Sequence, residues 1–170
     1  MLLEIEIRTV NNSKLIDKCN RHLNYLRISI TDRCNLQCRY CVPQDLIPKL
    51  SHREILTYEE ILRVVRIATR LGISKVRVTG GEPLVRKGVY DFFKELVTTA
   101  GLKDVSLTTN GVLLKDNLVK IQSAGITRIN VSLDTLNRKK YLEITGYDDF
   151  DLVWQGIEQA HEMGFYPIKL

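Results

Sequence analysis

Residues 25–41 read YLRISITDRCNLQCRYC, in which a short strand runs directly into a cysteine-rich loop. In the strand, apolar Leu26 and Ile28 alternate with polar Arg27, which is the period of a half-buried β-strand. The loop has the cysteine spacing C-x3-C-x2-C, formed by Cys34, Cys38 and Cys41. Because the loop after a strand of a βα barrel lies at the mouth where active sites are built, this segment predicts a metal or redox site there.

Outward from this segment, strands and helices alternate. We expect further strands at residues 75–79, 104–109, 128–133 and 167–170. The helices between these strands have the clearest signals. The first begins at a Thr57–Glu60 capping box and ends at Gly72, and the last is capped by Asp151 and ends before Gly164. Two further helices are expected at residues 89–97 and 118–124. Strands separated by such helices pair in parallel through right-handed crossovers. The sequence therefore predicts an α/β fold, either a partial barrel or a doubly wound sheet.

Each strand also carries polar residues on the face opposite its apolar one. On the second strand, for example, Val76 and Val78 oppose Arg77. A dry core could not hold such groups unpaired, so we expect this face to line a ligand cavity. The alternative, an antiparallel sheet with one wet face, is disfavoured by the intervening helices.

Composition limits the class of protein. The chain has 170 residues, 44% of them hydrophobic, with 25 Lys and Arg against 20 Asp and Glu, which is typical of one globular domain. A complete eight-stranded barrel takes about 250 residues, so a barrel here would be incomplete. With no long apolar stretch and no signal peptide pattern, we expect a cytoplasmic protein. Four cysteines, three of them clustered, suit a metal site better than a secreted disulfide framework.

The three clustered cysteines do not by themselves identify the metal. A four-iron cluster usually takes four cysteines, so three would leave one iron free for another ligand. Structural zinc needs a closed shell of four ligands, and His52 and Cys19 are the nearby candidates for a fourth. A cysteine cluster with no metal is the third alternative.

The cysteine loop resembles the signature of radical S-adenosylmethionine (SAM) enzymes. The longer match is to the molybdenum-cofactor biosynthesis protein A family, the GTP 3',8-cyclases. It rests on residues 20–34, the cysteine loop with Val42 and Pro43, and the segments 48–56, 77–84 (RVTGGEPL), 107–111 (LTTNG) and 128–134 (RINVSLD).

This resemblance implies a [4Fe-4S] cluster on Cys34, Cys38 and Cys41, with SAM on the open iron. An electron from the cluster would cleave SAM to a 5'-deoxyadenosyl radical. The implied cofactor-binding residues are Tyr40 against the adenine, Gly80, Gly81 and Glu82 in the loop after the second strand, and Ser132 on the fourth strand.

The resemblance also implies GTP as the substrate. The radical would abstract the 3' hydrogen of the GTP ribose, in the first step of molybdenum cofactor biosynthesis, and no catalytic side chain is implied beyond the cluster and SAM. The implied substrate-binding residues are Arg27, Lys75, Arg77, Thr108 and Lys169. The strand pattern supports this independently, since Lys75 and Arg77 share a face and converging cations suit an anion.

Further partners follow from the same resemblance. An electron donor of the flavodoxin or ferredoxin type is implied, a homodimer is compatible with the sequence, and neither nucleic acid nor membrane is expected as a partner.

The chain departs from this family at its end. Family members continue beyond Leu170 and carry a second three-cysteine cluster, whereas no cysteine follows Cys41 here. We therefore expect residues 25–170 to form an incomplete radical SAM core domain. Residues 1–24 are expected to form an N-terminal arm or edge segment. The alternative function is a non-catalytic iron-sulfur or zinc module without turnover.

Overall fold

The computed structural model describes residues 15–41, 49–51 and 53–170. The first fourteen residues of the expected arm lie outside the described residues, as do Val42, Pro43 and His52. The described end of the arm forms an isolated antiparallel bridge between Ile16 and His22. No helix in the described part of the chain is long and apolar enough to cross a membrane.

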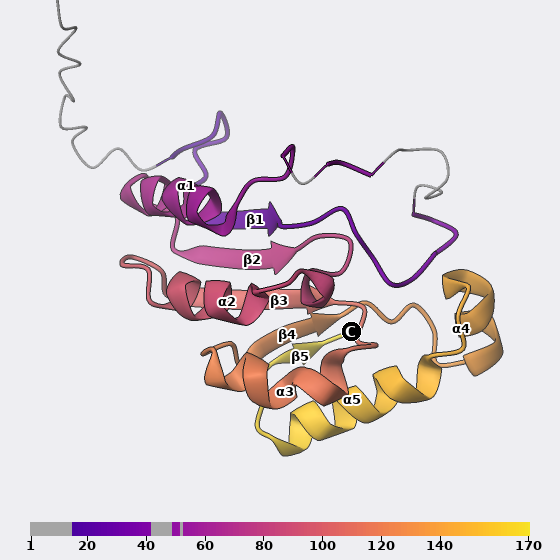
Figure 1. Cartoon of the computed structure of the whole chain (residues 1–170). Coiled ribbons are helices and arrows are strands. Elements are labelled where there is room, and N and C mark those ends of the chain that lie inside the picture. The colour runs from indigo at the N-terminus through magenta and orange to yellow at the C-terminus, as the bar shows by residue number, and fades with distance from the viewer. Residues whose placement is uncertain (1–14, 42–48, 52) are drawn as a thin grey trace, which may run out of the picture.

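Five parallel strands form one sheet in the order β1-β2-β3-β4-β5 (Figure 1). They are β1 (Tyr25–Ser29), β2 (Lys75–Thr79), β3 (Asp104–Thr109), β4 (Arg128–Val131) and β5 (Ile168–Lys169). Every strand is hydrogen-bonded to its neighbours in the sequence, so the order never reverses as it does in a doubly wound sheet. The expected partial barrel is confirmed.

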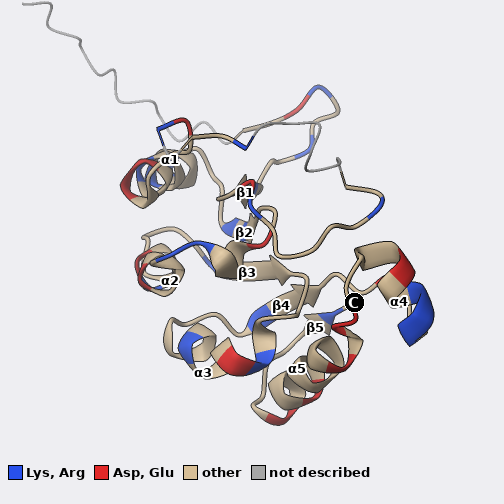
Figure 2. Cartoon of the chain, turned by 45° about the vertical axis from the view of Figure 1, so that its right-hand side comes forward, with Lys and Arg blue, Asp and Glu red and all other residues tan. Residues whose placement is uncertain are grey.

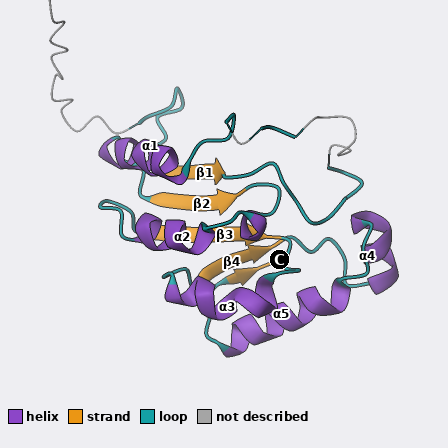
Figure 3. Cartoon of the chain, in the orientation of Figure 1, coloured by secondary structure: helices purple, strands orange, loops and turns teal. Residues whose placement is uncertain are grey.

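Helices cover one face of this sheet. They are α1 (Tyr58–Arg70), the 3₁₀ turn η1 (Pro83–Val85), α2 (Val89–Val97), α3 (Leu114–Ser123), α4 (Arg138–Thr145) and α5 (Phe150–Glu162). Figures 1 and 3 show α1, α2, α3 and α5 packed on the same side of the sheet, whereas α4 stands beyond the carboxyl ends of the strands. No helix of the described residues lies on the opposite face of the sheet.

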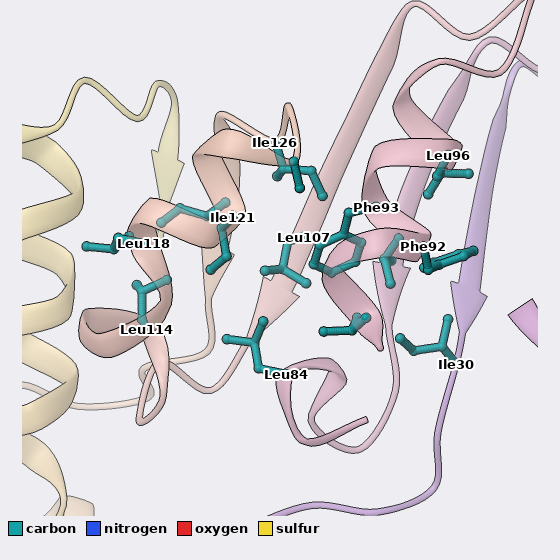
Figure 4. Close-up of a cluster of buried hydrophobic side chains, with 14 of the residues drawn as sticks. Ile30, Leu84, Phe92, Phe93, Leu96, Leu107, Leu114, Leu118, Ile121 and Ile126 are labelled. Atoms are coloured by element: carbon teal, nitrogen blue, oxygen red, sulfur yellow. The ribbon is translucent and has the colours of Figure 1, made fainter. Parts of the chain in front are cut away.

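The hydrophobic core lies between the sheet and these helices. Figure 4 shows side chains from α2, α3 and β3 meeting in one cluster, among them Phe93, Leu107 and Leu118, all fully buried. Val76 and Val78 of β2 join it, with 1% and 0% exposure. The apolar set of strand residues predicted from the alternation is therefore the set that packs on the helices.

Local capping signals explain some helix boundaries and not others. The predicted capping box of α1 is present, because Thr57 Oγ1 accepts from Glu60 N and Glu60 Oε2 accepts from Thr57 N. The expectation that Asp151 caps the last helix is wrong. That helix begins at Phe150, so Asp151 lies in its first turn and its carboxylate pairs with Arg138 at 2.8 Å.

Candidate functional site

The uncovered face of the sheet carries the polar residues in rows across the strands. Arg27, Arg77 and Ser106 are register partners on β1, β2 and β3. Two residues closer to the carboxyl ends, Thr108 is aligned with Asn130, which is aligned with Lys169. Figure 2 shows the basic positions on β2, β4 and β5 in blue. The predicted polar face is therefore continuous from β1 to β5.

A cavity of about 600 Å³ opens at the carboxyl end of this face, within the size range of small-molecule sites. Its lining contains four of the predicted site residues, Tyr40, Arg77, Ser132 and Lys169. The others that line it are Asn130, Val131, Leu133, Asp134 and Leu170. The structure thus brings together predicted cofactor-binding and substrate-binding residues that come from the cysteine loop, β2, the end of β4 and β5.

The remaining predicted substrate residues lie outside this cavity lining. Arg27 is exposed on β1 beside Arg77. Lys75 is exposed at the amino end of β2, two residues before Arg77. Three polar atoms on this face, Arg77 Nε, Thr108 Oγ1 and Arg128 Nε, are buried and have no hydrogen-bond partner among the described residues. Because buried polar atoms are rarely left unpaired, these three favour a polar ligand on this face of the sheet.

The cysteine loop follows β1 and is held against α4. The backbone amides of Gln37 and Arg39 donate to the carbonyls of Thr145 and Ile144, at 3.1 and 2.8 Å. These carbonyls belong to the last turn of α4, where a helix leaves its carbonyls without internal partners. Gly146 ends the helix with a φ of 80°. The helix end therefore fixes the backbone between the first and last cysteines of the loop.

The thiols of this loop suit an iron-sulfur cluster by kind and by number. Cys34, Cys38 and Cys41 are free, and soft thiolates are the usual ligands of such clusters. Burial raises the pKa of the Cys38 thiol, a hydrogen bond with Tyr40 lowers it, and the negative charges of Cys41 and Cys34 raise it further. Within the described residues, no three Cys, His, Asp or Glu side chains lie closely enough together to hold a metal ion. A cluster bound by these three thiols would therefore require them to move closer together.

Gly80 and Gly81 allow the loop after β2 to lie against the cysteine loop. Gly81 N donates to Thr31 O at 2.7 Å, and Glu82 N donates to Arg33 O at 2.8 Å. A Cβ on Gly80 would meet Thr31 O at 2.8 Å, and one on Gly81 would overlap Arg33 O. The close backbone approach expected of these glycines is therefore directed at the residues just before Cys34.

Glu82 is fully buried, and its carboxylate is occupied by the protein. Its oxygens accept from Leu84 N at 3.0 Å, from Thr109 Oγ1 at 3.0 Å and from Asn110 N at 2.7 Å. Burial raises the pKa of Glu82, and these hydrogen bonds oppose that rise. The carboxylate thus joins the loop after β2 to the end of β3, and any contact of Glu82 with a cofactor would involve its backbone.

Tyr40 connects the cysteine loop to the end of β4. Its hydroxyl donates to Asp134 Oδ2 at 2.8 Å, and most of the side chain is exposed, at 63%. Partial burial of the hydroxyl raises the pKa of Tyr40, as do the hydrogen bonds with Asp134 and Cys38. The Tyr40 side chain is thus held at the border of the cavity, where most of it is exposed.

Three residues of the site were given no role by the sequence. Asn110 follows β3 and contacts the cysteine loop. Asp134 holds Tyr40. Arg86 donates to Ile30 O at 2.5 Å and to Leu56 O at 2.7 Å, with its guanidinium 4.1 Å from the centroid of the Tyr58 ring. Asn110 and Asp134 could have been found from their places directly after strands, whereas nothing around Arg86 in the sequence indicates its partners.

Comparison with known protein families shows which proteins this chain resembles. A model of the radical SAM superfamily matches residues 28–170. Among curated relatives, the GTP 3',8-cyclase of Peptoclostridium acidaminophilum is 49% identical over 160 residues, which are 94% of this chain and 49% of that protein. The GTP 3',8-cyclase of Thermodesulfovibrio yellowstonii is 50% identical over 155 residues, 91% of this chain and 48% of that protein. The chain spans about half the length of these curated relatives.

Solved structures share the fold. Streptococcus suis SuiB bound to S-adenosylmethionine superposes with a TM-score of 0.69 and 25% identity, over 84% of this chain and 32% of SuiB. HydG, a maturase of the [FeFe]-hydrogenase, gives a TM-score of 0.69 and 22% identity, over 85% of this chain and 33% of HydG.

Proposed function

Because the chain belongs to the radical SAM superfamily, we propose that it carries the cluster-binding and SAM-binding region of a GTP 3',8-cyclase of molybdenum cofactor biosynthesis. The observation that carries the proposal is the convergence of Tyr40, Ser132, Arg77 and Lys169 on one cavity at the mouth of the sheet. Identity close to one half with curated cyclases supports this member of the superfamily over others.

In this proposal, Cys34, Cys38 and Cys41 hold a [4Fe-4S] cluster. When bound, the cluster and SAM would supply the radical chemistry: one electron would cleave SAM into methionine and a 5'-deoxyadenosyl radical, and that radical would remove the 3' hydrogen of the GTP ribose. The electron comes from a donor protein of the flavodoxin or ferredoxin type. Cofactors carry such reactions, and the protein supplies binding, orientation and exclusion of water.

The residues of this chain then position the two small molecules. Tyr40, fixed by Asp134, offers its ring to the adenine of SAM, and Ser132 offers a hydroxyl from the end of β4. The loop at Gly80 and Gly81 keeps the cysteine loop close to the sheet. The backbone carbonyls of that loop are the groups that can accept from the SAM ammonium.

The cations of the sheet bind the triphosphate. Arg77 and Lys169 line the cavity, Arg27 is the register partner of Arg77, and Lys75 shares the face of Arg77 on β2. Arginine pairs bidentately with phosphate, and lysine acts as a point charge. Thr108, with its buried and unpartnered hydroxyl oxygen, adds a neutral donor.

Anaerobic reconstitution tests the cluster. We expect the chain to bind about four irons and four sulfides per molecule, and Cys34→Ala to lose them, while Cys19→Ala retains them as the matched control. Stoichiometric zinc without iron in the reconstituted chain would contradict the proposal and favour a non-catalytic metal module. Release of 5'-deoxyadenosine from SAM under reducing conditions tests the next step, and no release from a loaded cluster would contradict it.

Binding of GTP is tested by calorimetry. Arg77→Ala should weaken GTP binding by about tenfold or more, because a charge-assisted contact contributes about 1.5–3 kcal/mol. Arg66→Ala, on the exposed outer surface of α1, is the matched control and should bind as the unaltered chain does. Equal affinity of the Arg77 variant would contradict the assignment of this face to the triphosphate.

A further inference from the structure

We infer that Asn110 is a positioning residue for the cluster ligand Cys34, and that its side-chain amide raises the reduction potential of the cluster by donating a hydrogen bond to the Cys34 sulfur. The inference rests on the proposed function, because it requires a cluster bound through Cys34. In that proposal, Asn110 contacts neither SAM nor GTP.

The contact is direct. Asn110 Nδ2 lies 3.7 Å from Cys34 Sγ and 2.8 Å from Asn35 Oδ1. An amide nitrogen carries two hydrogens, so one can serve each acceptor. Leu36 N also donates to Cys34 Sγ, at 3.4 Å. The Cys34 sulfur therefore accepts one hydrogen bond from its own loop and one from the end of β3.

The orientation of the Asn110 amide is determined by its other end. Asn110 Oδ1 accepts from Val112 N at 3.0 Å. A backbone N–H can only donate, so the atom that faces it must be the amide oxygen. The amide nitrogen, with its two hydrogens, then necessarily faces the cysteine loop.

The backbone of Asn110 is held as firmly as its side chain. Its amide N donates to Glu82 Oε2 at 2.7 Å, and Glu82 is 0% exposed. Thr109, the preceding residue, donates its hydroxyl to the same carboxylate and accepts from Gly111 N at 3.1 Å. A buried carboxylate from the loop after β2 therefore fixes the residue from the end of β3 that contacts a cysteine after β1.

The electrostatic consequence follows from the charge of the reduced cluster. Reduction adds an electron whose charge is shared with the ligating sulfurs, so a donor N–H near a sulfur stabilises the reduced state more than the oxidised one. Hydrogen bonds to the sulfurs are among the factors that set the potential of such clusters. Loss of the Asn110 donor should therefore shift the midpoint potential to a more negative value.

The test is a redox titration followed by electron paramagnetic resonance (EPR), on chains reconstituted with iron and sulfide and without SAM. Asn110→Ala removes the donor. Asn110→Leu has a side chain of similar size with no N–H and no added charge, and it is used if the alanine variant folds poorly. The matched control is Asn117→Ala, which removes an amide that donates to Leu113 O, just before α3, at 2.8 Å. We expect both Asn110 variants to have more negative midpoint potentials than the unaltered chain, and the control to match it.

The outcomes separate this inference from the proposed function. If all the chains assemble a cluster and the Asn110 variants keep the unaltered potential, the inference is overturned and the proposed function stands. A purely structural role for Asn110 would reduce cluster content or folding stability without moving the potential of the clusters that form, and that result overturns it too. If the unaltered chain takes up no iron and sulfide, the proposed function fails, and the inference fails with it.

Discussion

The packing of Gly81 against the cysteine loop leads to a quantitative prediction for Gly81→Ala. A Cβ at this position would lie 2.7 Å from the carbonyl carbon of Arg33, at least 0.7 Å short of the 3.4 Å at which ordinary contact begins. Both the obstructing atoms and the glycine are backbone, so the two loops must separate. A separation of this size would stretch the 2.8 Å bond from Glu82 N to Arg33 O past the usual limit of hydrogen bonding.

The loss of folding stability in Gly81→Ala follows from these two effects. Overpacking costs about 1–3 kcal/mol, and the lost hydrogen bond adds about 1 kcal/mol. We therefore expect Gly81→Ala to lower the free energy of unfolding by about 2–4 kcal/mol, which for a chain of this size lowers Tm by roughly 5–15 °C.

Denaturant unfolding monitored by circular dichroism measures this loss. The matched control is Gly164→Ala, where a Cβ meets nothing within 4 Å but the φ is 81°; left-handed backbone alone costs about 1–2 kcal/mol. We expect Gly81→Ala to be destabilised more than this control and to take up less iron on reconstitution. A Gly81 variant as stable as the unaltered chain would refute the proposed role of the close approach.

Three further predictions concern contacts around the sheet. Thr57→Ala removes the capping box of α1 and should cost about 1 kcal/mol of unfolding free energy, measured by denaturant midpoint; no change would show that the cap is not stabilising. Arg86→Lys cannot reach both Ile30 O and Leu56 O, and should cost about 1–3 kcal/mol; an unchanged midpoint would contradict the bridge. Arg138 lowers the pKa of Asp148 below its ordinary 3.8, so the stability from this pair is present above that pH and is lost on acidification. Arg138→Gln should raise the Asp148 pKa in an NMR titration and weaken the loss of stability in acid, and an unshifted Asp148 would contradict the pairing.

Much of the fold could be predicted from local patterns. The alternation in β2 separates Val76 and Val78, which are buried, from Arg77 on the cavity side, because side chains of a strand point to opposite faces in turn. The Thr57–Glu60 capping box fixes the start of α1 for an equally local reason.

Other elements had no clear local signal. Helix α4 was not predicted, since only Tyr141 and Thr145 of its eight residues are buried, and such a weak apolar stripe is hard to distinguish from a loop. Helix α3 begins at Leu114, four residues before the expected start at 118. Asp151 was assigned as a cap because it precedes an apolar run, but the helix includes it.

The site shows the same division between local and long-range information. Strand alternation placed Arg77 and Ser132 on the cavity side, and both line the cavity. The network of Glu82, Asn110 and Cys34 joins loops that follow three different strands. No spacing in the sequence encodes it, because each partner is brought into contact only by the parallel sheet.

The proposed function depends on three cysteines of this chain holding an iron-sulfur cluster with one iron open to SAM. The most direct measurement is the EPR spectrum of the reduced, anaerobically reconstituted chain, recorded before and after addition of SAM. We expect a [4Fe-4S]⁺ signal that changes on SAM binding and is missing from Cys34→Ala. A reduced cluster whose spectrum is unaffected by saturating SAM, or a chain that binds no iron, would contradict it.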